Sequence, residues 1–292
     1  MLPAVVFLAG VVICGFEPRV PSRAILPHGH WKNNEGGFFV HAGRGLTETA
    51  PAWFMAPMMA PADPPQPRFV VEFGKDGTPP AEAGRLDAPA FHRNHDAIWQ
   101  ALAPHLAAAR GNVLELGSGT GQHTVTYAAL TPALTWHPSD LQESHLASIE
   151  AWRTHTGLAN VAPPQRIDLT DPGWNWTPGG LLTAMLCINV LHISPWCVSQ
   201  NLIAGAGRLL DRAGRLFVYG PFKRDGAHTA PSNAEFDASL RARNPDWGVR
   251  DTRDLAALAA ANGLTLADVV PMPANNFILV IARDGRTSTT LN

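Results

Sequence analysis

One short stretch, residues 112–123 (NVLELGSGTGQH), constrains the fold more than any other part of the chain. It joins an apolar run, Val113 to Leu116, to a loop with glycine at alternate positions, and a helix-like segment follows. In α/β proteins, a strand, a glycine loop and the first turn of a helix together hold nucleotide-like ligands. The stretch therefore predicts a ligand-binding α/β fold, with a sharp turn that binds nothing as the alternative.

The spacing of the glycines distinguishes between kinds of ligand. The dinucleotide fingerprint G-x-G-x-x-G needs a glycine where this chain has Gln122, and no Gly-Lys-Ser/Thr of a P-loop follows. The pattern is instead E-x-G-x-G-x-G, formed by Glu115, Gly117, Gly119 and Gly121. It resembles the first motif of class I S-adenosylmethionine-dependent methyltransferases. That donor has no phosphate, and its cationic sulfonium and ammonium groups suit a carboxylate at the strand end.

Strand-like and helix-like segments alternate from residue 85 onward. Strands are expected at residues 112–116, 134–138, 161–167, 181–193, 214–220, 264–273 and 275–283. Helices are expected at residues 89–109, 121–130, 141–155, 195–210 and 252–263. Such alternation predicts a mostly parallel seven-stranded sheet with helices on both faces, and the terminal strand pair suggests an antiparallel edge strand. The expected fold is the Rossmann-like fold of class I methyltransferases.

The N-terminal part of the chain differs in composition from the rest, since 12 of the 26 prolines lie in residues 1–80. Proline removes backbone donors and fixes φ, so a proline-rich segment rarely builds a core. An overlong gene prediction, with a true start at Met55, Met58 or Met59, is one explanation. The expected organisation is a poorly ordered extension, a methyltransferase-like domain and a tail, at residues 1–84, 85–285 and 286–292.

Charge and cysteine content exclude several classes of function. With 22 Lys+Arg against 24 Asp+Glu, the chain has no general attraction to nucleic acid or to anionic membranes, so neither is an expected partner. Cys14, Cys187 and Cys197 form no CxxC pair or metal-binding spacing, so no metal is expected. Residues 1–16 are apolar, but they lack a preceding Lys or Arg and a closely following A-x-A site. We therefore expect a cytoplasmic protein.

Acidic residues follow the next two predicted strands. Asp140 ends the second strand, where a carboxylate can accept hydrogen bonds from both ribose hydroxyls of the donor. Asp168 ends the third strand, where it can accept from the adenine amino group, with Leu169 as an apolar wall. Asn189, after the fourth strand, could position the methionine end of the donor. Each has an alternative as a helix or turn cap, but two acids at successive strand ends favour a donor site.

A closer resemblance extends from about residue 85 to 283. It is carried by APAFHRNHDAI (88–98), SGTGQH (118–123), TWHPSD (135–140), CINVLHISPW (187–196), YGPFKRDGAHTAPSNAEFDASLRARNPDWGVRD (219–251) and MPANNFILV (272–280). Together these stretches resemble the domain-of-unknown-function 938 family, the methyltransferase-like protein 26 group. Membership implies a class I methyltransferase fold and says little about substrate. Two features depart from the family: His92 replaces a usually acidic residue, and residues 1–80 have no counterpart.

Methyl transfer needs an aligned acceptor, methyl group and sulfur, and often the removal of a proton. His192 is the first candidate base, because imidazole titrates near neutral pH; the alternative is a ring that bonds a neighbouring loop. Tyr219 is the second catalytic candidate and opens a polar insertion, 219–251, read as an acceptor-binding lid or an ordinary surface loop. Arg93 could pair with the donor carboxylate, and Asn94 shares its helix; a solvated arginine is the alternative.

These patterns predict methyl transfer from S-adenosylmethionine to an unidentified small-molecule acceptor. A non-catalytic protein that binds the donor remains the first rival, since no Asn-Pro-Pro-Tyr motif follows the fourth strand. A nicotinamide-dependent oxidoreductase is the second rival and is disfavoured by Gln122 in the loop.

Overall fold

The computed structural model describes residues 84–283, so the expected extension (apart from Gly84) and the tail lie outside the described residues. The helices are α1 (Pro89–Leu106), α2 (Gln122–Leu130), α3 (Glu143–Thr156), α4 (Trp196–Leu209), α5 (Pro231–Arg243) and α6 (Thr252–Ala261), with 3-10 turns η2 (Leu191–Ile193) and η3 (Pro273–Asn275). The strands are β1 (Gly111–Leu116), β2 (Leu134–Asp140), β3 (Gln165–Arg166), β4 (Leu182–Ile188), β5 (Leu210–Arg224), β6 (Ala227–His228), β7 (Arg250–Asp251), β8 (Leu264–Met272) and β9 (Asn276–Arg283).

Seven strands form the main path of the sheet, in the order β3-β2-β1-β4-β5-β9-β8. The pairs from β3 to β5 are parallel, and β9 pairs antiparallel with both β5 and β8. This confirms the predicted α/β class. The antiparallel strand is β9, however, which lies one place in from the edge because β8 pairs along its outer side.

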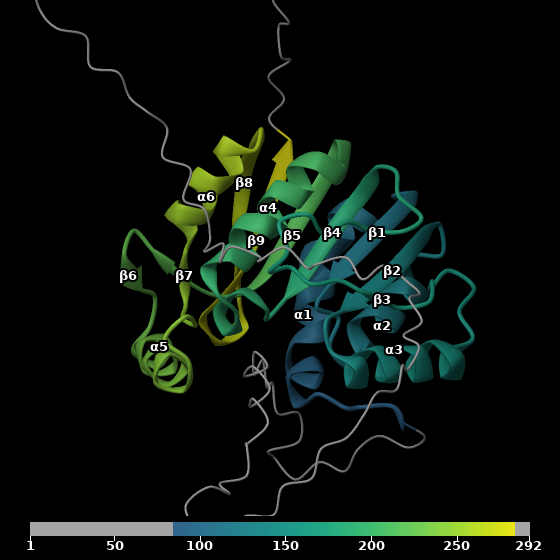
Figure 1. Cartoon of the computed structure of the whole chain (residues 1–292), viewed down its shortest axis with the longest axis horizontal. Coiled ribbons are helices and arrows are strands. Elements are labelled where there is room, and N and C mark those ends of the chain that lie inside the picture. The colour runs from purple at the N-terminus through teal and green to yellow at the C-terminus, as the bar shows by residue number, and fades with distance from the viewer. Residues whose placement is uncertain (1–83, 284–292) are drawn as a thin grey trace, which may run out of the picture. The chain divides into compact units, whose positions relative to one another are not determined.

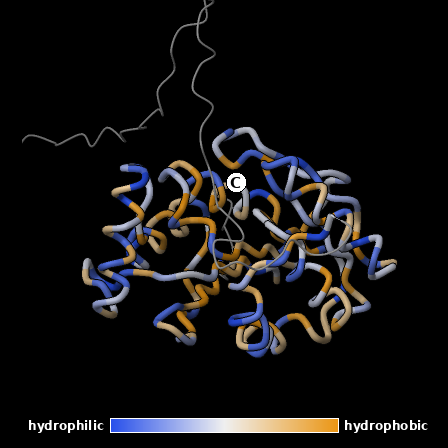
Figure 2. The backbone as a smooth tube through the Cα atoms, turned by 90° about the horizontal axis from the view of Figure 1, so that it is seen from below, coloured by the Kyte–Doolittle hydropathy of each residue, from blue (hydrophilic) through white to orange (hydrophobic). Residues whose placement is uncertain are grey.

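Helices cover both faces of this sheet, with α4 and α6 on one side and α1, α2 and α3 on the other (Figure 1). Alternate residues of β4 enter two separate cores: Met185 and Cys187 pack with α4 and α6, whereas Ala184 and Leu186 pack with α1 and α2. Hydrophobic residues accordingly gather inside the fold (Figure 2). The apolar run predicted as a central strand is therefore buried on both faces, as parallel sheets require.

Three local predictions need correction. Of the strand expected at 161–167, only β3 and one isolated bridge between Trp136 and Val161 form. The chain between Val161 and β3 contains two prolines, which have no N–H group to donate to a neighbouring strand. The N-cap of α6 is Asp251, whose side chain accepts from the Arg253 amide, so the expected threonine cap lies one residue too late. The polar insertion after β5 is not an ordinary loop, since it contains the 13-residue helix α5.

Candidate functional site

A cavity of about 190 Å³ opens where β1, β2 and β4 end and where the chain leaves β3. Ligands of open α/β sheets bind at this edge. Seven of the predicted donor-site residues line the cavity, namely Glu115, Gly117, Gly119, Asp140, Asp168, Leu169 and Asn189. The structure thus brings together residues that lie up to about 75 positions apart in the sequence.

The glycine loop explains part of this convergence. Gly117, Gly119 and Gly121 have φ values of 69°, 57° and 89°, a region that favours glycine. A Cβ on Gly117 would lie 2.6 Å from Val190 Cγ2, so its absence lets the loops after β1 and β4 meet at the cavity. A Cβ on Gly121 would lie 2.9 Å from Ile149 Cα, so this glycine lets α3 pack closely. Gly121 itself does not line the cavity.

Glu115 is the buried carboxylate of the site, with 1% of its surface exposed. Its Oε2 accepts a hydrogen bond from the Thr124 hydroxyl. Burial raises the pKa of the Glu115 carboxyl to about 7, and the neighbouring charge of Asp140 acts in the same direction. A carboxyl with this pKa gains most from a cation placed beside it, because the cation would favour the ionised form.

Asp140 holds the loop together as well as facing the cavity. Its Oδ2 accepts from the Gly119 amide at 2.9 Å, and its Oδ1 accepts from the Gln142 amide and from His145 Nδ1, both at 3.0 Å. A carboxylate offers about four acceptor positions. Three protein donors therefore leave room for about one further hydrogen bond, fewer than the two ribose contacts expected for this residue.

Asp168 is more open to a ligand. Its Oδ1 accepts from both the amide and the hydroxyl of Thr170, at 2.8 and 2.7 Å, which leaves Oδ2 for a donor in the cavity. Leu169 is 8% exposed, and its carbonyl accepts from the Asn201 side chain. Together with Ile167 it gives this end of the cavity an apolar wall beside Asp168 Oδ2, which accepts no hydrogen bond from residues 84–283. This arrangement suits a purine ring with an exocyclic amine.

Asn189 lies at the boundary between this cavity and a second hollow. Its φ of 58° is unusual for a residue other than glycine, and its amide donates to the Tyr219 carbonyl at 2.9 Å. It lines both spaces. Strained backbone of this kind is commonly found at functional sites.

The candidate base His192 lines the second hollow and not the first cavity. Burial lowers the pKa of His192 to about 4, and the positive charge of Arg250 adds to this effect. The ring is therefore neutral at physiological pH, and it contacts Phe236 edge-to-face at a centroid distance of 5.5 Å. Within residues 84–283 the ring of His192 has no hydrogen-bond partner, and its Nδ1 lies close to Gly220, 3.3 Å from the position that a Cβ there would take.

The other predicted residues lie near these spaces without lining them. Tyr219 is 5% exposed, and its hydroxyl lies near the side chains of Asn94 and Asn276. Burial raises the pKa of Tyr219, so the phenol keeps its proton. The Asn94 side chain also bonds His123 at 2.9 Å. Arg93 is exposed and contributes to neither lining.

Sequence reasoning missed several lining residues of the first cavity. Phe91 enters from α1, and His123 and His145 enter from α2 and α3. Phe91 packs on the His123 ring at 5.0 Å, and burial lowers the pKa of His123 to about 3. The position of His123, two residues after Gly121 in the first turn of α2, is the signal that could have indicated a cavity-facing side chain.

Within residues 84–283, no group of three or more histidine, cysteine or acidic side chains is arranged to hold a metal ion. No helix in the same range has both the length and the apolar character needed to cross a bilayer.

Comparisons with known proteins agree with this architecture. The profile of a family described as "Protein of unknown function (DUF938)" matches residues 85–283. Among solved structures, mitomycin 7-O-methyltransferase MmcR is similar at 20% identity and a TM-score of 0.52, covering 66% of this chain and 56% of that one. A second similar structure is the O-methyltransferase NcsB1 from neocarzinostatin biosynthesis, in complex with S-adenosylmethionine and 2-hydroxy-5-methyl naphthoic acid. Its sequence identity is 18% and its TM-score is 0.54, and the match covers 67% of this chain and 55% of that one.

An O-methyltransferase family protein from Burkholderia thailandensis is similar at 20% identity and a TM-score of 0.51, covering 66% of this chain and 59% of that one. The chain thus spans less than two thirds of the length of each of these structures. At such identities the likeness establishes a shared Rossmann-like methyltransferase fold.

Proposed function

Since this chain belongs to the DUF938 family, whose description names no reaction, we propose its function from the site: methyl transfer from S-adenosylmethionine to a small-molecule acceptor. One observation carries the proposal. A single cavity gathers Glu115, the glycine loop, Asp140 and Asp168, in the order of strands β1 to β3. These groups match, in order, the cationic methionine end, the ribose and the adenine of this donor.

The proposed orientation follows from the charges. The amino group and the sulfonium lie towards Glu115 and Asn189, because this end of the cavity has the buried Glu115 carboxylate and shares Asn189 with the lining of the second hollow. The adenine lies between Leu169 and Asp168 Oδ2. The methyl group then points towards the hollow that contains His192. The structural neighbours are named as methyltransferases, and one is described with the donor bound, which supports this reading by analogy of fold.

Isothermal titration calorimetry of the full chain with S-adenosylhomocysteine tests the donor site. We expect saturable one-to-one binding, weakened by roughly 1.5–3 kcal/mol in Asp140→Ala, the range typical of hydrogen bonds to charged groups. Absence of binding at high micromolar ligand contradicts the proposal. Saturable binding of NADH in a fluorescence titration, without binding of S-adenosylhomocysteine, would instead support an oxidoreductase.

The non-catalytic alternative is favoured by one observation, the low pKa of about 4 at His192, which makes it a weak base in the empty site. This alternative predicts donor binding with no methylated product. Incubation of the full chain with methyl-labelled S-adenosylmethionine and a metabolite extract separates the two functions: label transferred to a small molecule supports catalysis, and complete recovery of label in the donor supports a binding protein.

A further inference from the structure

The second hollow has a composition unlike that of the donor cavity. It is lined by Asn189, His192, Pro221, Ser232, Asn233, Phe236, Ala274 and Asn276. Three carboxamides and one hydroxyl provide neutral donors and acceptors, whereas none of these residues has a carboxylate, an ammonium or a guanidinium group. An ion that entered this space would lose water without gaining a counter-ion from its lining.

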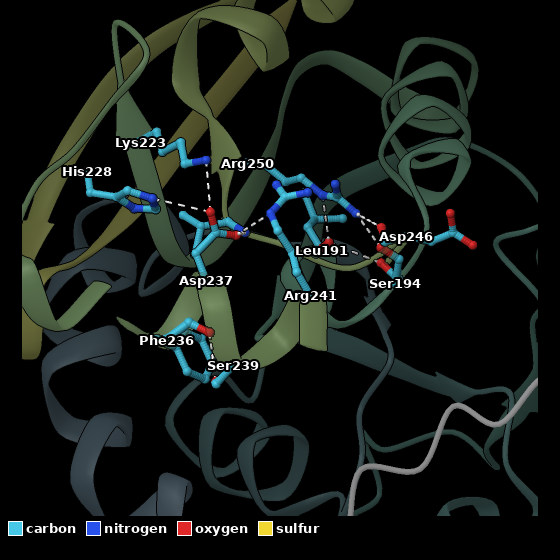
Figure 3. A network of polar contacts seen from close by, with 11 residues as sticks. Leu191, Ser194, Lys223, His228, Phe236, Asp237, Ser239, Arg241, Asp246 and Arg250 are labelled. Carbon is cyan, nitrogen blue, oxygen red and sulfur yellow. Dashed lines mark hydrogen bonds and ion pairs between the residues drawn. The ribbon is translucent and has the colours of Figure 1, made fainter. Parts of the chain in front are cut away.

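Asp237, the residue that follows Phe236 in α5, is already engaged with cationic partners. Asp237 of α5 is 5% exposed and pairs with Lys223 at 2.9 Å, His228 at 3.2 Å and Arg241 at 3.2 Å (Figure 3). Its Oδ1 also accepts from the Val249 amide at 2.8 Å. The single negative charge of Asp237 is therefore more than matched by its cationic partners.

Arg250 adds a further positive charge close to His192, the candidate base. Its guanidinium donates to the carbonyls of Leu191, at 3.0 Å, and Ser194, which flank His192 in the chain (Figure 3). The Gly248 amide donates to the His192 carbonyl at 3.0 Å. Segment 248–250 thus holds η2 in place, and the charge of Arg250 acts on the His192 ring itself. A second cation beside His192 would meet the same unfavourable interaction with the charge of Arg250.

The shape of the lining adds a preference for a flat molecule. The Phe236 ring, part of a side chain that is 38% exposed, meets the His192 ring edge-to-face, and Pro221 provides a second apolar surface. Aromatic faces and edges of this kind favour another aromatic ring. The carboxamides of Asn189 and Asn276 can hydrogen-bond polar groups on its rim.

We propose that this hollow binds the methyl acceptor as a planar molecule that enters uncharged and offers a phenol-like hydroxyl as the nucleophile, and that it excludes protonated amines. The inference rests on the proposed function, because the sulfonium of the donor supplies a further positive charge on the other side of Asn189. A protonated amine would be repelled from both sides, and it has no lone pair with which to attack the methyl group.

The reaction balances with the groups present. The acceptor O–H bond breaks and its proton passes to the His192 ring, the oxygen forms a bond to the methyl carbon, and the carbon–sulfur bond breaks with its electron pair retained by sulfur. The products are a methyl ether, S-adenosylhomocysteine and an imidazolium that releases its proton to water. A weak base removes a proton more readily from a phenol, with a pKa of about 10, than from an alcohol, whose pKa is close to the value of about 16 for water.

Three probes with one ring and different tails test the inference: 4-ethylphenol (neutral), 4-hydroxyphenylacetate (anionic) and tyramine (cationic). The full chain is first saturated with S-adenosylhomocysteine, which lacks the sulfonium, so that the charge of Arg250 alone acts on the probes; each probe is then titrated by NMR and calorimetry. We expect 4-ethylphenol to bind at least about tenfold more tightly than tyramine, the effect of one unfavourable charge pair at a distance of about 10 Å. Perturbed signals should include His192, Asn189 and Asn276.

A variant with an added carboxylate sharpens the test. Ser232→Asp introduces a negative charge into the lining at the exposed first turn of α5, where an acidic residue suits the helix dipole. We expect it to raise the affinity for tyramine about tenfold relative to that for 4-ethylphenol. Ser239→Asp makes the same substitution on the same helix outside the lining and should leave the ratio unchanged.

The outcomes separate this inference from the proposed function. If S-adenosylhomocysteine does not bind, the proposed function fails, and the acceptor assignment that rests on it fails with it. If it binds but tyramine or 4-hydroxyphenylacetate binds as tightly as 4-ethylphenol, or none of the probes binds at millimolar concentration, the acceptor assignment alone is overturned. A ratio that responds equally to Ser232→Asp and Ser239→Asp also contradicts it.

Discussion

The two spaces at the ends of the strands are built in different ways. The donor cavity is formed by short motifs at successive strand ends, so that the spacing of Glu115, Asp140 and Asp168 in the sequence already orders them in space. The second hollow combines the β4 loop, helix α5 and the 3-10 turn η3, which meet only in the folded chain. The comparison suggests a cavity adapted to one fixed ligand beside a hollow adapted to a particular acceptor.

The largest expected effect comes from the glycine loop that builds the donor cavity. In Gly121→Ala the new Cβ would lie 2.9 Å from the Ile149 backbone at a φ of 89°, so we expect a loss of about 3–5 kcal/mol in unfolding free energy. Gly157→Ala is the matched control, because its φ is 61° but nothing lies within 4 Å. It should lose only about 1–2 kcal/mol. Equal losses in urea unfolding would contradict the close packing assigned to Gly121.

The next effect concerns pH and the buried carboxyl of the donor cavity. The Glu115 pKa is about 7 in the folded chain against 4.5 in the unfolded one, so the unfolded state releases its proton first. The wild type should lose about 3 kcal/mol of stability as pH rises from 4.5 to 7, and Glu115→Gln should not. Chemical unfolding at several pH values measures this difference.

The control for the pH effect is Glu150, whose pKa is lowered by its hydrogen bonds to Arg153. Its contribution to stability is complete above pH 4.5 and lost only below, so Glu150→Gln should leave the slope between 4.5 and 7 unchanged. If the free energy of unfolding still falls between pH 4.5 and 7 in Glu115→Gln, another group titrates in this range.

If the donor cation lies beside Glu115, affinity for S-adenosylmethionine should also rise as pH increases through 7.

Within the donor cavity the two aspartates should behave differently. Asp140→Ala removes the acceptor of three protein hydrogen bonds, so it should lower both donor affinity, by about 1.5–3 kcal/mol, and the stability of the loop. Asp168→Ala frees only Thr170 and should lower affinity with a smaller loss of stability. Calorimetry and thermal unfolding of both variants measure the contrast, which equal stability losses would contradict.

The smallest effect separates the two spaces directly. His192 lines only the second hollow, so His192→Asn should change the affinity for S-adenosylhomocysteine by no more than about 0.5 kcal/mol, the usual range for positions away from a contact. The same variant should abolish transfer to a phenolic acceptor if the ring removes the proton. A donor affinity reduced as strongly as in Asp140→Ala would place His192 in the donor site instead.

The sequence predicts the donor cavity better than the second hollow for a physical reason. Parallel strands carry their last residues to one edge, so the position of Asp140 and Asp168 in the sequence already predicts that both line one cavity. Helix α5 has few apolar residues, and Asp237 joins it to Lys223 and to the Val249 amide through polar contacts. No helical period therefore marks this segment in the sequence, which left an acceptor-binding lid and a surface loop as its two interpretations. The sequence also does not show which side of a helix faces the cavity. We expected Arg93 to contact the donor, but Phe91 of the same helix lines the cavity and Arg93 is exposed.

A crystal structure of the full chain with S-adenosylhomocysteine would show the position and the direction of the donor. We expect the adenine amino group at Asp168 Oδ2, the ribose at Asp140 and the sulfur directed past Asn189 towards His192. A ligand that lies in the reverse direction, with its adenine beside Glu115, or that binds outside this cavity, would contradict the proposed donor site.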